Sequence, residues 1–158
     1  MTRLLPGVAV MLVLLSSVSN ADDVVPAAEP GPPPVGKASL WDGIYTEAQA
    51  LRGAYLYPGP CGKCHGVRLD GAPEDPDMFS TKPIAGAKFL RDWDGRSLGT
   101  LFDYLQTTMP ENNPGFLSAM EYADLVAFML FKSGVPAGGA ELRIDSPAIR
   151  ALRIGVAP

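Results

Sequence analysis

The sequence predicts an all-α fold in which three main helices are joined by long loops. Helix-start signals at Thr46, Ser97 and Ser118 are each followed by apolar residues at helical spacing. No stretch has the clear alternation of apolar and polar residues that predicts a β-strand. Between Gly66 and Gly95 the chain is rich in glycine, proline and aspartate. So long an irregular stretch fits a compact domain if it wraps something other than protein.

The first two helices are predicted from their N-terminal caps. Thr46 and Gln49 form a capping box, because the threonine hydroxyl and the glutamine side chain can each satisfy an amide at the start of the helix. This helix is predicted to end before Pro58. The second helix is predicted over residues 98–106, with Ser97 as its N-cap.

The last third of the chain is predicted to hold one long helix and one short helix. The long helix covers residues 119–132 and follows a capping box of Ser118 and Glu121. The short helix starts at Ser146 and Pro147. The apolar stripe that identifies the long helix consists of Tyr122, Leu125, Val126, Met129 and Leu130.

Residues 1–21 have the pattern of a secretory signal peptide. Arg3 supplies the positive charge, residues 4–18 are almost all apolar, and the residues up to Ala21 fit the cleavage rule. The alternative is an uncleaved membrane anchor, but the apolar run is shorter than the roughly 20 residues that cross a bilayer. We therefore expect a periplasmic or secreted protein without stable membrane insertion after cleavage.

Three further parts follow the leader. Residues 22–38 are rich in proline and are predicted to form a disordered linker. Residues 39–134 contain the three main helices and form the predicted domain. Residues 135–158 form a C-terminal extension.

The charge of the chain argues against nucleic acid as a partner. The chain has 13 basic and 17 acidic residues, and removal of the leader with its Arg3 changes the formal net charge from −4 to −5. An acidic protein can be steered toward a partner that carries a basic patch.

Cys61, Cys64 and His65 form the Cys-x-x-Cys-His pattern of haem c attachment. Two cysteines three positions apart lie on one side of a helical turn, so each thiol can form a thioether with a haem vinyl group and the histidine can bind the iron. A zinc site needs four ligands, whereas the chain has two cysteines and one histidine. A thioredoxin-like pair needs a βαβ setting, and a disulfide leaves the sole histidine unexplained. We therefore predict one covalently bound haem c.

The second axial ligand must be a methionine or a lysine, because there is no second histidine. Met109 is the predicted ligand, since it lies in a proline-flanked loop directly after the second helix. Met120 and Met129 lie in the third helix and are predicted to pack there, and the first two methionines belong to the leader. Met78, in an acidic loop after the motif, is the alternative ligand.

From Tyr45 to Ser133 the sequence resembles the class I c-type cytochromes, which implies a cytochrome c fold wrapped around one covalent haem. Within that family it is most similar to the periplasmic cytochromes found beside quinoprotein and related dehydrogenases. The resemblance is carried, in order, by residues 46–53 with Tyr57, Cys61-x-x-Cys64-His65-Gly66, Pro83-Ile84-Ala85-Gly86, Thr108-Met109-Pro110 and residues 124–130.

The resemblance also implies how the first and last helices meet. Gly53 and Tyr57 match the positions at which the first helix crosses the last one. Leu125 and Phe128 match their partners on the last helix.

Three further residues match contacts of the haem in this family. The carbonyl of Pro83 matches the acceptor for the second ring N–H of the proximal histidine, a bond that fixes the ring and raises its basicity. Ile84 matches a residue that touches the haem face. Trp93 matches an aromatic residue that reaches a haem propionate, with core packing as the alternative.

These residues predict an electron-transfer protein and not an enzyme. A haem with both His65 and Met109 as ligands has no site open for a substrate, so we expect a one-electron carrier. Its expected partners are a periplasmic dehydrogenase as donor and, on the way to the respiratory chain, an oxidase or another cytochrome as acceptor. A haem enzyme or gas sensor would need an open sixth position. A dedicated subunit of one dehydrogenase complex is a further alternative, which co-purification would distinguish from a free shuttle.

Overall fold

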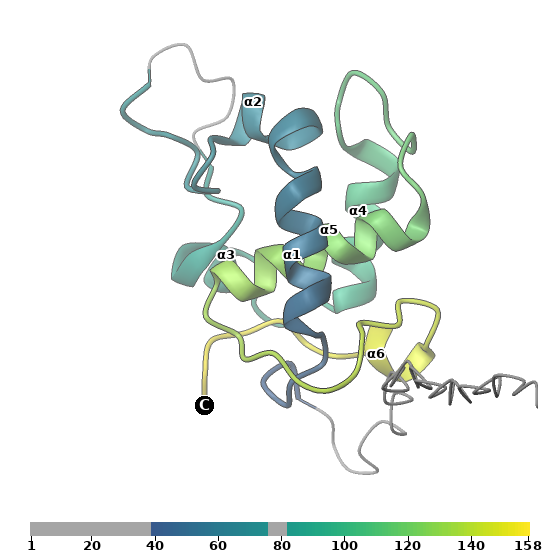
Figure 1. Ribbon diagram of the computed structural model, residues 1–158. Helices are drawn as coiled ribbons and strands as arrows, with labels where there is room; N and C mark the ends of the chain where they lie inside the picture. Colours follow the sequence, from purple (N-terminus) through teal and green to yellow (C-terminus); the bar gives the residue numbers. More distant parts are fainter. Residues whose placement is uncertain (1–38, 76–81) are drawn as a thin grey trace, which may run out of the picture.

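The computed structural model of the chain describes residues 39–75 and 82–158 (Figure 1). Every regular element in these ranges is helical, and β-pairing there is limited to an isolated bridge between Ser97 and Arg153. The predicted all-α class is therefore confirmed. The predictions for the leader, the linker and Met78 fall outside the described residues. The elements are α1 (Glu47–Leu56), the π-helical turn η1 (Pro58–Gly62), α2 (Lys63–His65), α3 (Gly86–Asp92), α4 (Leu98–Thr108), α5 (Ala119–Lys132) and α6 (Pro147–Arg150).

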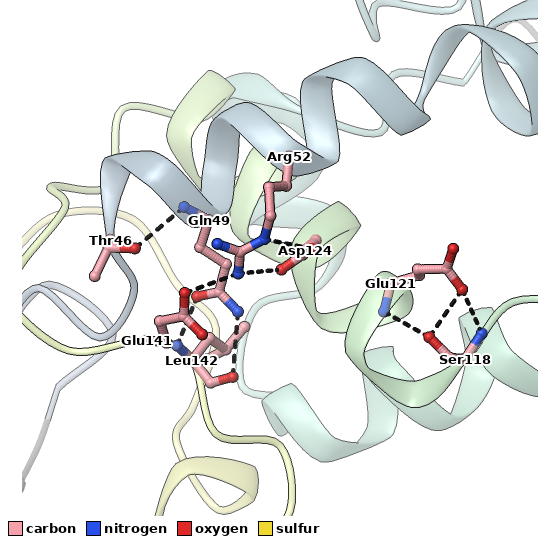
Figure 2. A network of polar contacts seen from close by, with 8 residues as sticks. All are labelled: Thr46, Gln49, Arg52, Ser118, Glu121, Asp124, Glu141 and Leu142. Atoms are coloured by element: carbon pink, nitrogen blue, oxygen red, sulfur yellow. Dashed lines mark hydrogen bonds and ion pairs between the residues drawn. The ribbon is translucent and has the colours of Figure 1, made fainter. Parts of the chain in front are cut away.

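The predicted helix starts are confirmed. The side chains of Thr46, Ser97 and Ser118 each accept a hydrogen bond from the backbone amide three residues later. The capping box at Ser118 is complete, whereas the one predicted at Thr46 is half formed (Figure 2). Gln49 does not return to the amide of Thr46, because its side chain is bound to both backbone groups of Leu142. The second helix, α4, runs two residues further than predicted.

The crossing of α1 and α5 forms the centre of the fold (Figure 1). Gly53 permits it, since a Cβ atom there would lie 2.0 Å from the carbonyl oxygen of Asp124 and 2.9 Å from Cβ of Phe128. One turn later, the ring of Tyr57 packs edge-on against Phe128, with ring centroids 5.6 Å apart. The predicted crossing is thus confirmed, except that the backbone of Asp124 replaces Leu125 as the second contact of Gly53. Leu125 itself is buried.

A polar network joins this crossing to the C-terminal extension (Figure 2). Arg52 on α1 donates to both carboxylate oxygens of Asp124 on α5, each at 2.9 Å, and to Glu141 in the extension at 2.8 Å. These two acidic partners, Asp124 first, raise the pKa of Arg52. The neighbouring Gln49 accepts from the amide of Leu142 at 2.6 Å. One face of α1 is therefore tied to two segments that follow it by more than seventy residues.

Helix α3 was not predicted, because it lies inside the stretch that looked irregular. Its N-cap, Ala85, makes no side-chain cap bond. The amide of Gly86 is satisfied instead by the hydroxyl of Ser133, 47 residues away, at 2.9 Å. Phe89 and Leu90 anchor the helix by burial in the core.

The C-terminal extension packs against the same core as the helices. It runs past the N-terminal end of α1, at the end of the molecule opposite α2 (Figure 1). The amide of Leu98 donates to the carbonyl of Leu152 at 2.8 Å, and the amide of Ile154 donates to the carbonyl of Arg96 at 2.9 Å. The short helix predicted at Ser146 is confirmed as α6. The extension contributes four buried aliphatic side chains, namely Val135, Leu142, Leu152 and Ile154.

Candidate haem site

The turn that carries the two cysteines is held at both ends by one tyrosine. The carbonyl of Tyr57 accepts from the amides of Cys61 and Gly62 at 3.1 and 3.0 Å, which gives this segment its π-helical turn. The hydroxyl of Tyr57 donates to the carbonyl of Gly66 at 2.7 Å, directly after the histidine. Burial, followed by the nearby Cys61, raises the pKa of Tyr57, so the hydroxyl stays protonated and remains a donor. The first helix thereby fixes the shape of the whole motif.

The two cysteines are free thiols in different surroundings. Cys61 is half-buried and packs against the core, whereas Cys64 is exposed, and no disulfide joins them. Burial, followed by the charge of Cys64, raises the pKa of Cys61 to about 11. A redox-active pair of the thioredoxin type lowers the pKa of its nucleophilic cysteine. The environment of Cys61 therefore argues against that alternative.

His65 leaves one ring nitrogen ready for a partner. Its Nδ1 atom is buried and makes no hydrogen bond within the described structure. Burial also lowers the pKa of His65, which favours the neutral imidazole that binds metals. A buried polar atom without a partner is rare in a folded protein and needs a reason. Two thiols and a neutral imidazole on one fixed turn form a donor set that fits haem c.

The Nδ1 atom of His65 makes no hydrogen bond to the carbonyl of Pro83 in the described structure, and the role of Pro83 toward the second ring nitrogen stays a prediction. The segment that carries Pro83 nevertheless lies beside the chain that follows the motif. The amide of Ile84 donates to the carbonyl of Leu69 at 2.9 Å, and Ile84 is half-buried against the core.

Trp93 lies in an aromatic cluster at the end of α3. Its ring contacts Phe89 and Tyr104, with ring centroids 6.2 and 5.8 Å apart. The guanidinium of Arg96 lies over the Trp93 ring, 5.1 Å from its centroid. These contacts account for the packing alternative, and the role toward a propionate stays a prediction.

Met109 lies at the end of α4, where the loop to α5 begins. Its amide donates to the carbonyl of Leu105 at 2.9 Å, and its own carbonyl accepts from the hydroxyl of Tyr122 at 2.7 Å. The side chain is half-buried. This loop and α2 both lie at the end of the molecule where α1 ends (Figure 1).

The other methionines divide as follows. Met129 is buried, as predicted for a packing residue. Met120 is 78% exposed, so its predicted packing role is wrong: it lies on the outer face at the start of α5. The role of Met109 as a ligand stays a prediction.

The hydroxyl of Tyr122 is the functional group that the sequence pattern did not reveal. The pattern placed Tyr122 in the apolar stripe of α5, and its ring does pack in the core, with 1% exposure. Its hydroxyl, however, binds two points of the loop that begins at Met109, namely the Met109 carbonyl and the Gly115 amide. A tyrosine in an apolar stripe is a signal for such a bond, because a buried hydroxyl needs a partner.

Two kinds of feature are absent from the described part of the chain. Across residues 39–75 and 82–158, no three side chains of His, Cys, Asp or Glu gather as a metal cluster. None of the helices described there has the length and apolar character that a membrane span requires.

The sequence model of the family described as cytochrome c oxidase, cbb3-type, subunit III matches residues 48–129, just over half of the chain. No curated protein is significantly similar to the chain. Among solved structures, the sulfane dehydrogenase SoxCD from Paracoccus pantotrophus is similar, with 19% identity and a TM-score of 0.40. That match covers 67% of this chain and 59% of the other, so this chain spans less than two thirds of the length of its structural neighbour.

Proposed function

Since the chain belongs to the family of cytochrome c oxidase, cbb3-type, subunit III, we propose that its haem is ligated by His65 and Met109 and relays single electrons from a periplasmic dehydrogenase toward the respiratory chain. The family makes the chain a class I c-type cytochrome with a covalently bound haem c, and hence an electron-transfer protein. The proposal adds the residues that bind the haem, the location of the protein and its redox partners.

One observation carries the proposal. The only histidine of the chain follows the only two cysteines, and its buried Nδ1 atom has no partner in the described structure. Tyr57 holds the turn that carries all three residues, so their arrangement does not depend on a flexible loop.

The residues of the site would have different roles in binding the haem. Haem c supplies one-electron redox chemistry when bound, because its iron is stable as both ferric and ferrous. Cys61 and Cys64 would hold the group through two thioethers, and the neutral ring of His65 would provide a nitrogen ligand. Met109 would provide a thioether, a soft ligand that raises the reduction potential.

The proposed location is the periplasm. It is supported by the signal-peptide pattern of residues 1–21, whose cleavage would leave the proline-rich residues 22–38 at the N-terminus of the mature protein. We propose residues 39–134 as the cytochrome domain, with residues 135–158 as an extension that packs on it. The proposed partners are a dehydrogenase as donor and an oxidase or another cytochrome as acceptor.

The first prediction concerns the two thioethers. The protein matured in a periplasm should give a haem-stained band on a denaturing gel, because covalent haem survives denaturation. Replacement of both Cys61 and Cys64 by serine should abolish that stain, and each single replacement should leave one thioether and a shifted pyridine haemochrome spectrum. An unstained wild-type band from a correctly matured preparation would contradict the attachment.

The second prediction tests the axial ligand. Met109→Ala should lower the reduction potential, remove the sulfur-to-iron absorption band of the ferric protein and let the ferrous iron bind carbon monoxide. Met120→Ala is the matched control, since Met120 is 78% exposed and its loss should change none of these properties. A Met109→Ala spectrum and potential equal to those of the wild type would overturn the assignment. A wild type that already binds carbon monoxide would favour an enzyme or sensor instead.

A further inference from the structure

The loop between α4 and α5 is joined to α5 by a single side-chain hydroxyl. The hydroxyl of Tyr122 donates to the carbonyl of Met109 at 2.7 Å and accepts from the amide of Gly115 at 3.1 Å. Met109 is the first residue of the loop and Gly115 lies in its second half, so one hydroxyl closes residues 109–115. A phenol hydroxyl has one donor and can accept, and both capacities are used here.

The first part of the loop has few other contacts that hold it. Residues 111–116 are exposed, so burial contributes little to their position, whereas Leu117, next to the start of α5, is buried. The amide of Asn113 donates to the carbonyl of Pro110 at 2.9 Å, but this bond lies within the loop and does not connect it to a helix. Among the described hydrogen bonds, those made by Tyr122 are the ones that connect residues 109–115 to α5.

The ring of Tyr122 is fixed, and this makes its hydroxyl a rigid anchor. The side chain is 1% exposed and packs edge-on against Phe102 of α4, with ring centroids 6.3 Å apart. A phenylalanine would fill the same space without placing a polar atom in the core. A buried hydroxyl is retained at a desolvation cost unless it is bonded, so its bonds to Met109 and Gly115 are the reason for a tyrosine at this position.

We propose that Tyr122 is a positioning residue whose hydroxyl closes the loop at residues 109–115 and thereby holds the thioether of Met109 on the haem iron. This inference rests on the proposed ligation by Met109 and adds what controls the lability of that ligand. The backbone of Met109 is pinned on its amide side by Leu105 and on its carbonyl side by Tyr122. Its side chain therefore starts from a fixed point, which lowers the entropy that ligation must overcome.

The experiment replaces Tyr122 by phenylalanine in the complete, haem-loaded protein. The ferric wild type must lose its methionine before external imidazole can bind, so the rate of imidazole uptake at saturating concentration reports on the release of Met109. One neutral hydrogen bond corresponds to a factor of about two to ten in an equilibrium constant. Loss of both bonds of Tyr122 should therefore accelerate imidazole uptake on the order of tenfold.

The matched control is Tyr45→Phe. Tyr45 is also fully buried, and its hydroxyl also donates to a backbone carbonyl, that of Val135 at 2.5 Å. Val135 belongs to the extension, which lies at the opposite end of α1 from α2 (Figure 1). This variant should lose global stability but leave imidazole uptake within twofold of wild type.

Amide hydrogen exchange of Gly115 provides a readout that does not depend on the haem ligand. It should accelerate in Tyr122→Phe and stay unchanged in Tyr45→Phe. Faster exchange at Gly115 with unchanged imidazole uptake would overturn the inference, because the hydroxyl would then close the loop without holding the ligand. Equal acceleration of imidazole uptake in both tyrosine variants would also overturn it. Failure of Met109 ligation itself is recognised separately, by an unaltered spectrum of Met109→Ala.

Discussion

Replacement of Gly53 by leucine is expected to destabilise the folded protein by about 3 kcal/mol or more. A Cβ atom at this position would lie 2.0 Å from the carbonyl oxygen of Asp124 and 2.6 Å from its carbonyl carbon. Backbone atoms in the middle of α5 cannot move aside, and Arg52 additionally holds the Asp124 side chain. The two helices would have to separate, which would also break the edge-on contact between Tyr57 and Phe128.

The variant Gly53→Ala distinguishes the steric effect of the close helix crossing from the effect of helix propensity. Alanine favours a helix over glycine by about 1 kcal/mol, so propensity alone predicts that Gly53→Ala stabilises the protein. The close approach to Asp124 predicts the opposite sign. Chemical denaturation of the haem-loaded protein would measure both, with Gly139→Ala as control, because a Cβ atom at Gly139 meets no atom within 4 Å. A neutral or stabilised Gly53→Ala would show that α1 and α5 do not cross as closely as described.

The three main helices were predictable because their signals are local. A capping serine or threonine acts on an amide only three residues away, so the pattern at Thr46, Ser97 and Ser118 contains the whole interaction. The apolar stripe of α5 likewise needs no knowledge of its partner. The Cys-x-x-Cys-His motif is local in the same sense, and its residues do share one turn.

The features that were missed depend on residues far apart in the chain. Helix α3 starts without a cap of its own, because Ser133 supplies the acceptor for Gly86 from 47 residues away. The side chain of Gln49 was predicted to accept a hydrogen bond from the amide of Thr46. In the structure it is bonded to the backbone of Leu142 instead. A rule that uses only neighbouring residues cannot predict a hydrogen-bond partner that tertiary folding brings close from a distant part of the chain.

The same limit applies within the candidate site. The half-buried position of Cys61 and the unpaired Nδ1 of His65 depend on how α1 and η1 pack, so the spacing of residues in the sequence does not predict them. The hydrogen bonds of the Tyr122 hydroxyl were not predicted, because the apolar pattern counts a tyrosine by its ring and not by its hydroxyl. The ligand role of Met109, by contrast, came from elimination among six methionines and stays a prediction.

Deletion of residues 135–158 is expected to lower the free energy of unfolding by about as much as a typical domain has in total. The sequence predicted this segment to be a C-terminal extension of the domain over residues 39–134, but four of its side chains are buried in the core. Full burial of an aliphatic side chain contributes about 1.5 to 3 kcal/mol. Four such residues are lost by truncation after Gly134, while a typical domain is stable by about 5 to 15 kcal/mol. The four lost residues are Val135, Leu142, Leu152 and Ile154.

The truncation also leaves polar groups without partners. Gln49, which is 2% exposed, would lose both of its bonds to Leu142. If its side chain stays buried, each unsatisfied group costs about 1 to 3 kcal/mol in addition to the lost packing. The exposed Arg96 would also lose the bond from the amide of Ile154 to its carbonyl. We therefore expect the truncated chain to be unfolded or molten without haem, and to denature at a much lower temperature with it.

Near-UV circular dichroism and thermal denaturation of the haem-loaded proteins would measure this effect. Truncation after Gly155 is the matched control, because the three residues it removes are exposed and their loss should leave the midpoint unchanged. A chain ending at Gly134 that keeps the wild-type midpoint would contradict the expectation, and residues 39–134 would then form an independent domain. A midpoint that falls for the deletion of 135–158 but not for the control would instead make the extension part of the cytochrome fold, since the buried Leu152 and Ile154 lie in the segment that only the longer deletion removes.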